Sequence, residues 1–322
     1  IVAYVTLYVL LSLEIVVIVM NSYLKSSNTH RRNKVIYLLS LIPLILYAIY
    51  KNGILAYNRH LIGFLGIFKP LYLVILGSLI CYTYLYVSNK YIHKNKDIKK
   101  EFKNSYEIIY VIILTLSLPI KTPILFYTLS VLIYLLGSDY LKRFKINVLS
   151  IVRLLLIFLL VVLNKYSYMN VYEDNVLTAY TTFDMFFGRI VGSMGGVSSV
   201  LLIISYIILL FNPSYKREIP VFIVITYFIV SLGFGMFTHD IKDALKLMLT
   251  NEVLFPSIYV ATVSIASPIL NNKKIIYGVG IGILGFVLAR FMGKEGIYVA
   301  IVIMNIILII LEKLGEVVAK KS

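Results

Sequence analysis

Long runs of apolar residues, separated by short charged breaks, recur along the whole chain. Many of these runs approach the roughly 20 residues that an α-helix needs to cross about 30 Å of hydrocarbon. A helix also satisfies its backbone amides and carbonyls within one segment, as hydrocarbon requires. The pattern predicts an all-α, polytopic transmembrane helical bundle of about ten to eleven helices. Its expected spans are residues 1–20, 35–50, 61–87, 107–119, 122–137, 148–163, 198–211, 219–237, 253–270, 275–290 and 297–311.

Prolines and charges refine this pattern. Pro119 and Pro123 separate two neighbouring spans and mark either a tight hairpin or a broken helix. Lysine and arginine gather in alternate loops, and the positive-inside rule assigns these loops and the C-terminal tail to the cytoplasm. The opposite loops, residues 164–184 and 238–252, are expected to face outward.

Composition supports a membrane protein and argues against other classes. The chain has 322 residues, of which 60% are hydrophobic and 14% charged, with a mean hydropathy of +0.90. A soluble core of this size needs less apolar surface. The net charge of +16 reports topology and predicts no nucleic-acid partner, because the basic residues lie in short loops. Cys81 is the one cysteine and the four histidines are scattered, so we expect no metal site.

Residues 188–200 read GRIVGSMGGVSSV and are unusually rich in glycine and serine. They follow an outward loop and precede a span, which places them at or just inside the outer membrane face. Two interpretations remain open. Gly192 and Gly196 have the GxxxG spacing of close helix packing. Alternatively, the irregular backbone lines a cavity, where free amides bind an anionic or polar ligand.

Several segments follow one another in a characteristic order. They read LTLSLPIKTPILFYTLSVLIYLLG (114–137), INVLSIVRLLLIF (146–158), GSMGGVSS (192–199), REIPVFIV (217–224), ATVSIASPILNNKKIIYGVGIG (261–282) and GKEGIYVAIVIMN (293–305). Together they resemble the RnfD/NqrB family, the flavin-bearing membrane subunits of the Rnf and sodium-pumping NADH:quinone oxidoreductase complexes. The resemblance covers residues from about 30 to 312.

This resemblance implies a membrane domain at residues 25–322, built from two related five-helix halves at about 30–163 and 185–312. Residues 1–24 precede the resemblance and are expected to form an extra N-terminal transmembrane helix. The family also implies an FMN joined by a phosphoester to a threonine on the outer face. Some members bind a second flavin, riboflavin or a related form, among the helices.

The resemblance also implies the site residues. The family pattern at the flavin attachment point matches residues 175–181, so Thr181 is the implied acceptor, and the alternative is an ordinary loop hydroxyl. The other implied cofactor-binding residues are Thr178, Gly192, Ser193, Gly195, Ser198, Arg153 and Asn147.

Departures from the family pattern occur at Asn175, Tyr180, Gly196 and Val263. Three of these positions carry a carboxylate in the family. Carboxylates inside a membrane are costly and mark functional contacts or ion routes, so their replacement weakens the case for ion movement through this chain.

Two charged positions have open interpretations. Arg153 lies in an apolar run near a basic loop, so its guanidinium either snorkels to the surface or contacts a flavin. Arg290 and Glu295 lie close together in sequence and are expected to pair with each other or with water.

The leading function is a membrane subunit of an Rnf-like, ion-translocating electron transport complex, which carries flavin and passes electrons across or along the membrane. The resemblance implies that such a chain is not a complete enzyme alone. Its expected partners are the other subunits of the complex, a flavin transferase and the lipid bilayer of a prokaryotic plasma membrane. The alternatives are a transporter or channel with a decayed flavin site, and a scaffold for redox partners.

Overall fold

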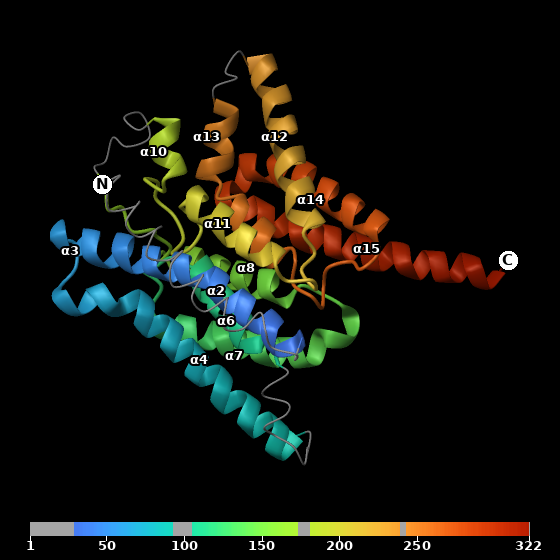
Figure 1. Cartoon of the computed structure of the whole chain (residues 1–322), viewed down its shortest axis with the longest axis horizontal. Coiled ribbons are helices and arrows are strands. Elements are labelled where there is room, and N and C mark those ends of the chain that lie inside the picture. Colours follow the sequence, from blue (N-terminus) through green and yellow to red (C-terminus); the bar gives the residue numbers. More distant parts are fainter. Residues whose placement is uncertain (1–28, 93–104, 173–180, 239–242, 322) are drawn as a thin grey trace. The chain divides into compact units, whose positions relative to one another are not determined.

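The structure is a computed structural model that describes residues 29–92, 105–172, 181–238 and 243–321 (Figure 1). The described residues form helices, turns and irregular segments, and no strand occurs among them. The expected first helix at 1–24 and the candidate residue Thr178 lie outside them. The chain forms two compact units, and each is interrupted in sequence. The two family-type halves stay a prediction.

The first unit takes the chain up to Leu135 and again from Leu163 to Tyr215. Helix α2 contacts α4, α6 and α11, and α4 also contacts α6. The principal helices are α2 (Thr29–Ile49), α4 (Lys69–Val87), α6 (Glu107–Ser117) and α11 (Ser199–Leu210). The shorter elements are η1 (Tyr50–Leu55), α3 (Ala56–Asn58), η2 (Phe64–Phe68), η3 (Ser88–Ile92) and α10 (Thr182–Phe186).

A hairpin at the two prolines joins α6 to α7 (Ile124–Leu141). The Tyr134 hydroxyl donates to Glu107 Oε2 at 2.8 Å, and the hydroxyls of Thr115 and Tyr127 lie 2.8 Å apart. Residues early in one helix thus meet residues late in the other, so the two helices are antiparallel. The hairpin interpretation of residues 118–123 is confirmed, because Pro119 has no amide hydrogen with which to continue α6.

The second unit comprises Leu136–Val162 and Lys216–Ser322. In it α14 (Asn271–Met292) packs between α12 (Glu218–Thr238) and α15 (Gly296–Lys321), and α15 also contacts α8 (Val148–Val162). Figure 1 shows α14 and α15 running side by side. The shorter elements are η4 (Lys142–Phe144), α13 (Asp243–Thr250), η5 (Pro256–Val260) and η6 (Gly293–Glu295).

Glycines allow α12 and α14 to approach closely. A Cβ at Gly282 would lie 2.9 Å from the Ile223 carbonyl oxygen and 3.0 Å from the Tyr227 nitrogen. A Cβ at Gly278 would lie 2.7 Å from Phe222 Cβ and 3.2 Å from the Ile219 carbonyl oxygen. The small-xxx-small pair that brings helices together is therefore Gly278 and Gly282.

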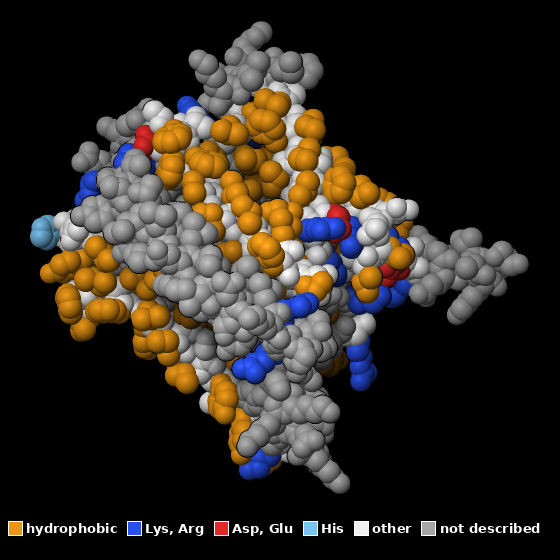
Figure 2. Space-filling model, in the orientation of Figure 1, with side chains coloured by type: hydrophobic (Ala, Val, Ile, Leu, Met, Phe, Trp, Pro, Cys, Tyr) orange, Lys and Arg blue, Asp and Glu red, His pale blue; other side chains and the backbone are white. Residues whose placement is uncertain are grey.

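The protein is a multi-pass membrane protein. Within the described residues, five helical stretches are long and apolar enough to cross a bilayer, and three shorter apolar helices accompany them. Figure 2 shows apolar side chains gathered over α12, where Ile225 and Ile229 are 50% and 60% exposed. An apolar surface of this kind is compatible with lipid contact.

The expected span at 253–270 is wrong. This segment contains one π-helical turn, η5, followed by turns and irregular backbone up to α14. Pro256 and Pro268 interrupt regular backbone pairing, and the segment is largely buried within the second unit. Irregular backbone is tolerated at membrane depth where protein covers it and supplies hydrogen-bond partners. The segment has such partners, described below.

Candidate functional site

Thr181 is exposed and caps the short helix α10. Its hydroxyl accepts the Asp184 amide at 3.2 Å and donates to Asp184 Oδ2 at 2.9 Å. Asp184 in turn pairs with Arg189 at 2.7 Å. An N-cap of this kind is worth about 0.5–2 kcal/mol. The hydroxyl thus has a local structural role, and its exposure leaves it within reach of a modifying enzyme.

The glycine-rich stretch 192–198 is buried and non-helical. Its amides are used by the end of α6: Met194 N–H donates to the Leu118 carbonyl at 3.1 Å, and Gly195 N–H to the Leu116 carbonyl at 2.8 Å. A helix leaves its last carbonyls without intrahelical partners, and here the break at Pro119 would otherwise leave them buried and unpaired. The stretch therefore completes the broken end of α6. The GxxxG helix-packing interpretation of Gly192 and Gly196 is wrong, because neither glycine is in a helix.

A second set of polar side chains holds the chain just before this stretch. The hydroxyls of Tyr47 and Tyr172 donate to the carbonyls of Phe187 at 3.1 Å and Gly188 at 3.4 Å. Lys51, whose residue is only 1% exposed, donates to the Ile190 carbonyl. Gly188 has φ +96°, and a Cβ there would meet the Tyr47 ring.

The sequence patterns did not identify Lys51 as a site residue. Its signal was a lysine placed directly after an apolar run, followed by Asn52 and Gly53. In the structure it lies within the π-helical turn η1, a kind of element that is frequent at functional sites.

These contacts test how a flavin would fit. The exposed Thr181 hydroxyl fits an attachment point for a phosphoester. The amides of Met194 and Gly195 do not form an open cradle, since both donate to α6. The Ser198 hydroxyl is 1% exposed as a residue and has no hydrogen-bond partner, so it is a buried polar atom available to a ligand. Thr181 and Ser198 fit the group, and the glycine amides fit a structural role.

Arg153 and Asn147, the remaining candidates, belong to the second unit. Arg153 is 1% exposed, pairs through Nη1 and Nη2 with the Glu295 carboxylate, and stacks with its guanidinium carbon 3.5 Å from the Tyr298 ring centroid. The snorkelling interpretation of Arg153 is therefore wrong. The pairing of Glu295 with Arg290 is not the one observed, since Arg290 instead lies 4.0 Å over the Phe234 ring.

Asn147 and Asn305 hold the irregular segment that replaces the expected span. Asn147 Nδ2 donates to the Val260 carbonyl at 2.8 Å, and Asn305 Nδ2 donates to the Ala266 carbonyl at 2.8 Å. The Asn147 backbone amide donates to Asn305 Oδ1 at 3.0 Å, which joins the two side chains into one network. These bonds explain why the backbone can leave the helix here.

Lys216 completes that support from the loop before α12. Its ammonium donates to the Ser267 carbonyl and hydroxyl, each at 2.6 Å, and to the Ser264 carbonyl at 3.3 Å. Burial, and then the charge of Lys274, lower the pKa of Lys216 from its ordinary value to about 8.

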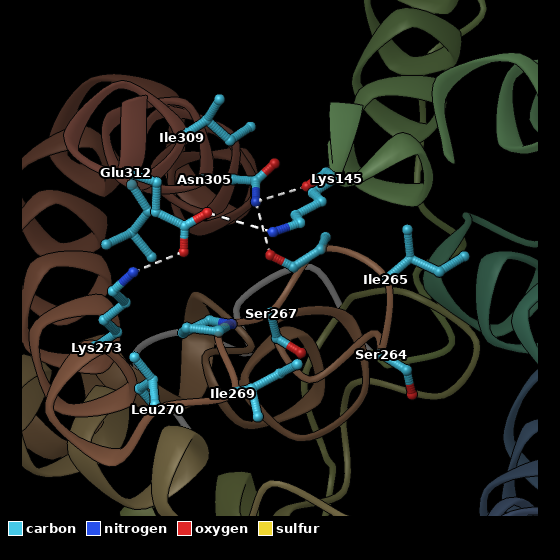
Figure 3. Close-up of a pocket in the computed structure, with 13 residues that line it drawn as sticks. Lys145, Ser264, Ile265, Ser267, Ile269, Leu270, Lys273, Asn305, Ile309 and Glu312 are labelled. Carbon is cyan, nitrogen blue, oxygen red and sulfur yellow. Dashed lines mark hydrogen bonds and ion pairs between the residues drawn. The ribbon is translucent and has the colours of Figure 1, made fainter. Parts of the chain in front are cut away.

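A cavity of about 350 Å³ lies beside the same segment (Figure 3). It is bounded by residues 264–270, Lys145, Lys273 and the α15 residues Asn305, Leu308, Ile309 and Glu312. All of these residues belong to the second unit. The sequence patterns did not predict this cavity, because its walls come from segments far apart along the chain.

Comparison with known proteins decides the family. Residues 146–317, more than half of the chain, match the NQR2, RnfD, RnfE family. The chain belongs to this family. The matched region includes Thr181, the glycine-rich stretch, Asn147, Arg153 and the cavity. The resemblance over residues 30–145 remains a prediction, since the match begins at residue 146.

Two curated relatives agree with this placement. The chain is 26% identical over 136 residues to the D subunit of the Na⁺-translocating ferredoxin:NAD⁺ oxidoreductase complex of Acetobacterium woodii, covering 41% of each chain. It is 27% identical over 135 residues to the D subunit of the proton-translocating ferredoxin:NAD⁺ oxidoreductase complex of Clostridium ljungdahlii, covering 41% of this chain and 40% of the relative. The alignments thus span about two fifths of the length of these relatives.

Proposed function

We propose that this chain is the RnfD-type member of an Rnf-like, ion-translocating electron transport complex, in which it carries flavin and passes electrons between partner subunits. The family match over residues 146–317 carries this proposal. Both curated relatives belong to ferredoxin:NAD⁺ oxidoreductase complexes, in which they are the corresponding membrane component by name. Its partners would be the remaining subunits and a flavin transferase.

Within this function, Thr181 would hold an FMN through a phosphoester at its exposed hydroxyl. A bound flavin supplies electron transfer, while the protein supplies binding and orientation. Arg189 lies next to this position through Asp184 and is 23% exposed, so it would contribute positive charge near a phosphate. Ser198 would offer its hydroxyl to the same ligand or to a second flavin such as riboflavin.

Mass spectrometry of the Thr181 peptide from protein made in its native host tests this proposal. We expect the peptide to carry the added mass of FMN, and the denatured protein to fluoresce in a gel. Thr181→Asn should abolish both signals, because asparagine caps a helix as threonine does but has no hydroxyl. Thr181→Ser should retain them, and Thr182→Ala is the matched control that leaves the acceptor in place.

An unmodified Thr181 peptide in protein assembled with its partners would contradict the attachment. If the complex with Thr181→Asn transferred electrons at the wild-type rate, the chain would act as a scaffold. Solute uptake by the chain alone in liposomes would instead support the transporter alternative.

We further propose that Thr181 faces outward and the C-terminus faces the cytoplasm, as the basic loops indicate. Cys81 is buried, so the wild-type chain gives a low labelling background. A membrane-impermeant maleimide on intact cells should label Phe183→Cys, where the native side chain is exposed next to Thr181. It should label Arg143→Cys, at an exposed position in a basic loop, after permeabilisation alone. The reverse pattern would invert the topology.

A further inference from the structure

The cavity in the second unit has polar groups on one side that gather positive charge. Lys273 Nζ lies 2.9 Å from Glu312 Oε1, and Lys145 Nζ lies 3.4 Å from Glu312 Oε2. Figure 3 shows the two lysines reaching the same carboxylate from different sides. A third ammonium, that of Lys216, bonds to Ser267, which also lines the cavity. Glu312 is the one carboxylate among the described lining residues. The site therefore carries a net positive charge.

The ion pairs at this site are accessible to exchange. The side chains of Lys145, Lys273 and Glu312 are 67%, 35% and 32% exposed. Ion pairs at such exposure contribute little to stability, so a second anion can replace the carboxylate. The lowered pKa of Lys216, caused by burial and by Lys274, fits a local surplus of positive charge.

The opposite wall of the cavity is apolar and strongly exposed. Ile269 is 81% exposed and Leu270 is 62% exposed. Ile309 and Leu308 of α15 line the same space. Positive side chains next to exposed aliphatic ones are typical of the level at which lipid headgroups meet acyl chains. The volume of about 350 Å³ lies within the range of small-ligand pockets.

We propose that this cavity binds an anionic phospholipid, with the headgroup phosphate on Lys145 and Lys273 and an acyl chain against Ile269 and Leu270. In the unliganded structure the Glu312 carboxylate occupies the position of the phosphate. The site is independent of the proposed flavin at Thr181, because every residue in it belongs to the second unit.

Native mass spectrometry of the purified full-length protein tests the site. The protein is titrated with phosphatidylglycerol or with phosphatidylcholine that has the same acyl chains. We expect at least about fivefold tighter binding of phosphatidylglycerol, since each lysine near an anionic surface is worth about a factor of five. Equal affinity for the two lipids would overturn the proposal.

Two sets of variants separate this site from general charge effects. Lys145→Gln with Lys273→Gln should weaken phosphatidylglycerol binding roughly 20-fold, with little change for phosphatidylcholine. Lys121→Gln with Lys165→Gln removes the same net charge at exposed positions of the first unit and should change little. Similar losses in both double variants would show that bulk charge, and no particular site, attracts the lipid.

Glu312→Gln gives an opposite expectation. It removes the internal competitor of the phosphate and should tighten phosphatidylglycerol binding about fivefold. A merely structural role for the ion pairs predicts no such gain. Glycerol 3-phosphate distinguishes the source of the phosphate: we expect it to compete weakly, since it lacks acyl chains. If it bound as tightly as the phospholipid, the ligand would be a soluble phosphate and the lipid assignment would fail.

Discussion

Replacing Arg153 by methionine is expected to lower the free energy of unfolding of the second unit by about 3–5 kcal/mol. Arg153 and Glu295 are both buried, and they satisfy each other through two nitrogen–oxygen contacts. Without the guanidinium, the Glu295 carboxylate stays buried with its charge uncompensated. The variant also loses the stacking of Arg153 on Tyr298.

Thermal unfolding of the purified protein, followed by far-UV circular dichroism in detergent, measures this loss. Arg153→Met with Glu295→Gln should recover most of the stability, because the remaining groups carry no charge. Arg290→Met is the matched control: Arg290 is exposed and stacks on Phe234, so its loss should cost less than about 1 kcal/mol. A single variant as stable as the control would refute a tight ion pair.

Replacing Gly282 by alanine is expected to destabilise the second unit by about 1–3 kcal/mol. The added methyl group would lie within 3.0 Å of Thr226 Cβ, the Ile223 carbonyl oxygen and the Tyr227 nitrogen. Two of these atoms belong to the backbone of α12, which can yield only by moving the whole helix. The contact between α12 and α14 is extensive in this unit, so separating them affects much of its core.

The matched control makes the same substitution on α12. A Cβ at Gly233 would meet nothing within 4 Å. Gly233→Ala should therefore be neutral or stabilising by up to about 1 kcal/mol, because alanine is the better helix former. Chemical denaturation of both variants under identical conditions gives the comparison. Equal stability of the two would show that α12 and α14 do not meet at Gly282.

Apolar periodicity identified most of the helices. The runs near residues 35–50, 61–87 and 219–237 coincide with helices, and the tandem runs from 275 to 311 coincide with α14 and α15. These elements were predictable because hydrophobic length is a local property. The hairpin at Pro119 and Pro123 was predictable as well, since proline removes a backbone donor wherever it stands.

The segment 253–270 was misassigned because hydropathy does not record backbone hydrogen bonds. Its composition is that of a span, yet its carbonyls at Val260 and Ala266 bond to the side chains of Asn147 and Asn305. Those asparagines are far away in sequence. No local pattern shows that they meet this segment.

The two GxxxG-spaced pairs make the same point. Gly192 and Gly196 stand next to a Gly/Ser cluster and attracted the packing interpretation, but their segment is irregular and completes α6. Gly278 and Gly282 lie in an ordinary apolar run and bring α12 against α14. Spacing indicates that a close approach is possible, while the neighbouring element decides whether one occurs.

Among the candidate site residues, Thr181 was found through the family resemblance, and the structure places its hydroxyl at an exposed N-cap. Arg153 was recognised as an unusual intramembrane charge, but its partner Glu295 was not assigned to it. Lys51 escaped notice because a lysine next to an apolar run is common at membrane surfaces. Its burial follows from contacts with the chain around Ile190.

Read from the amino acids alone, this chain is a helical membrane protein of the RnfD/NqrB type, because apolar length and motif order are written along one dimension. The partners of its buried polar groups became visible through the three-dimensional arrangement. Arg153 meets Glu295, the amides of the glycine-rich stretch meet α6, and Lys145 and Lys273 meet Glu312 beside one cavity. A polar group inside a bilayer protein must be satisfied, but which distant segment satisfies it depends on how the helices pack.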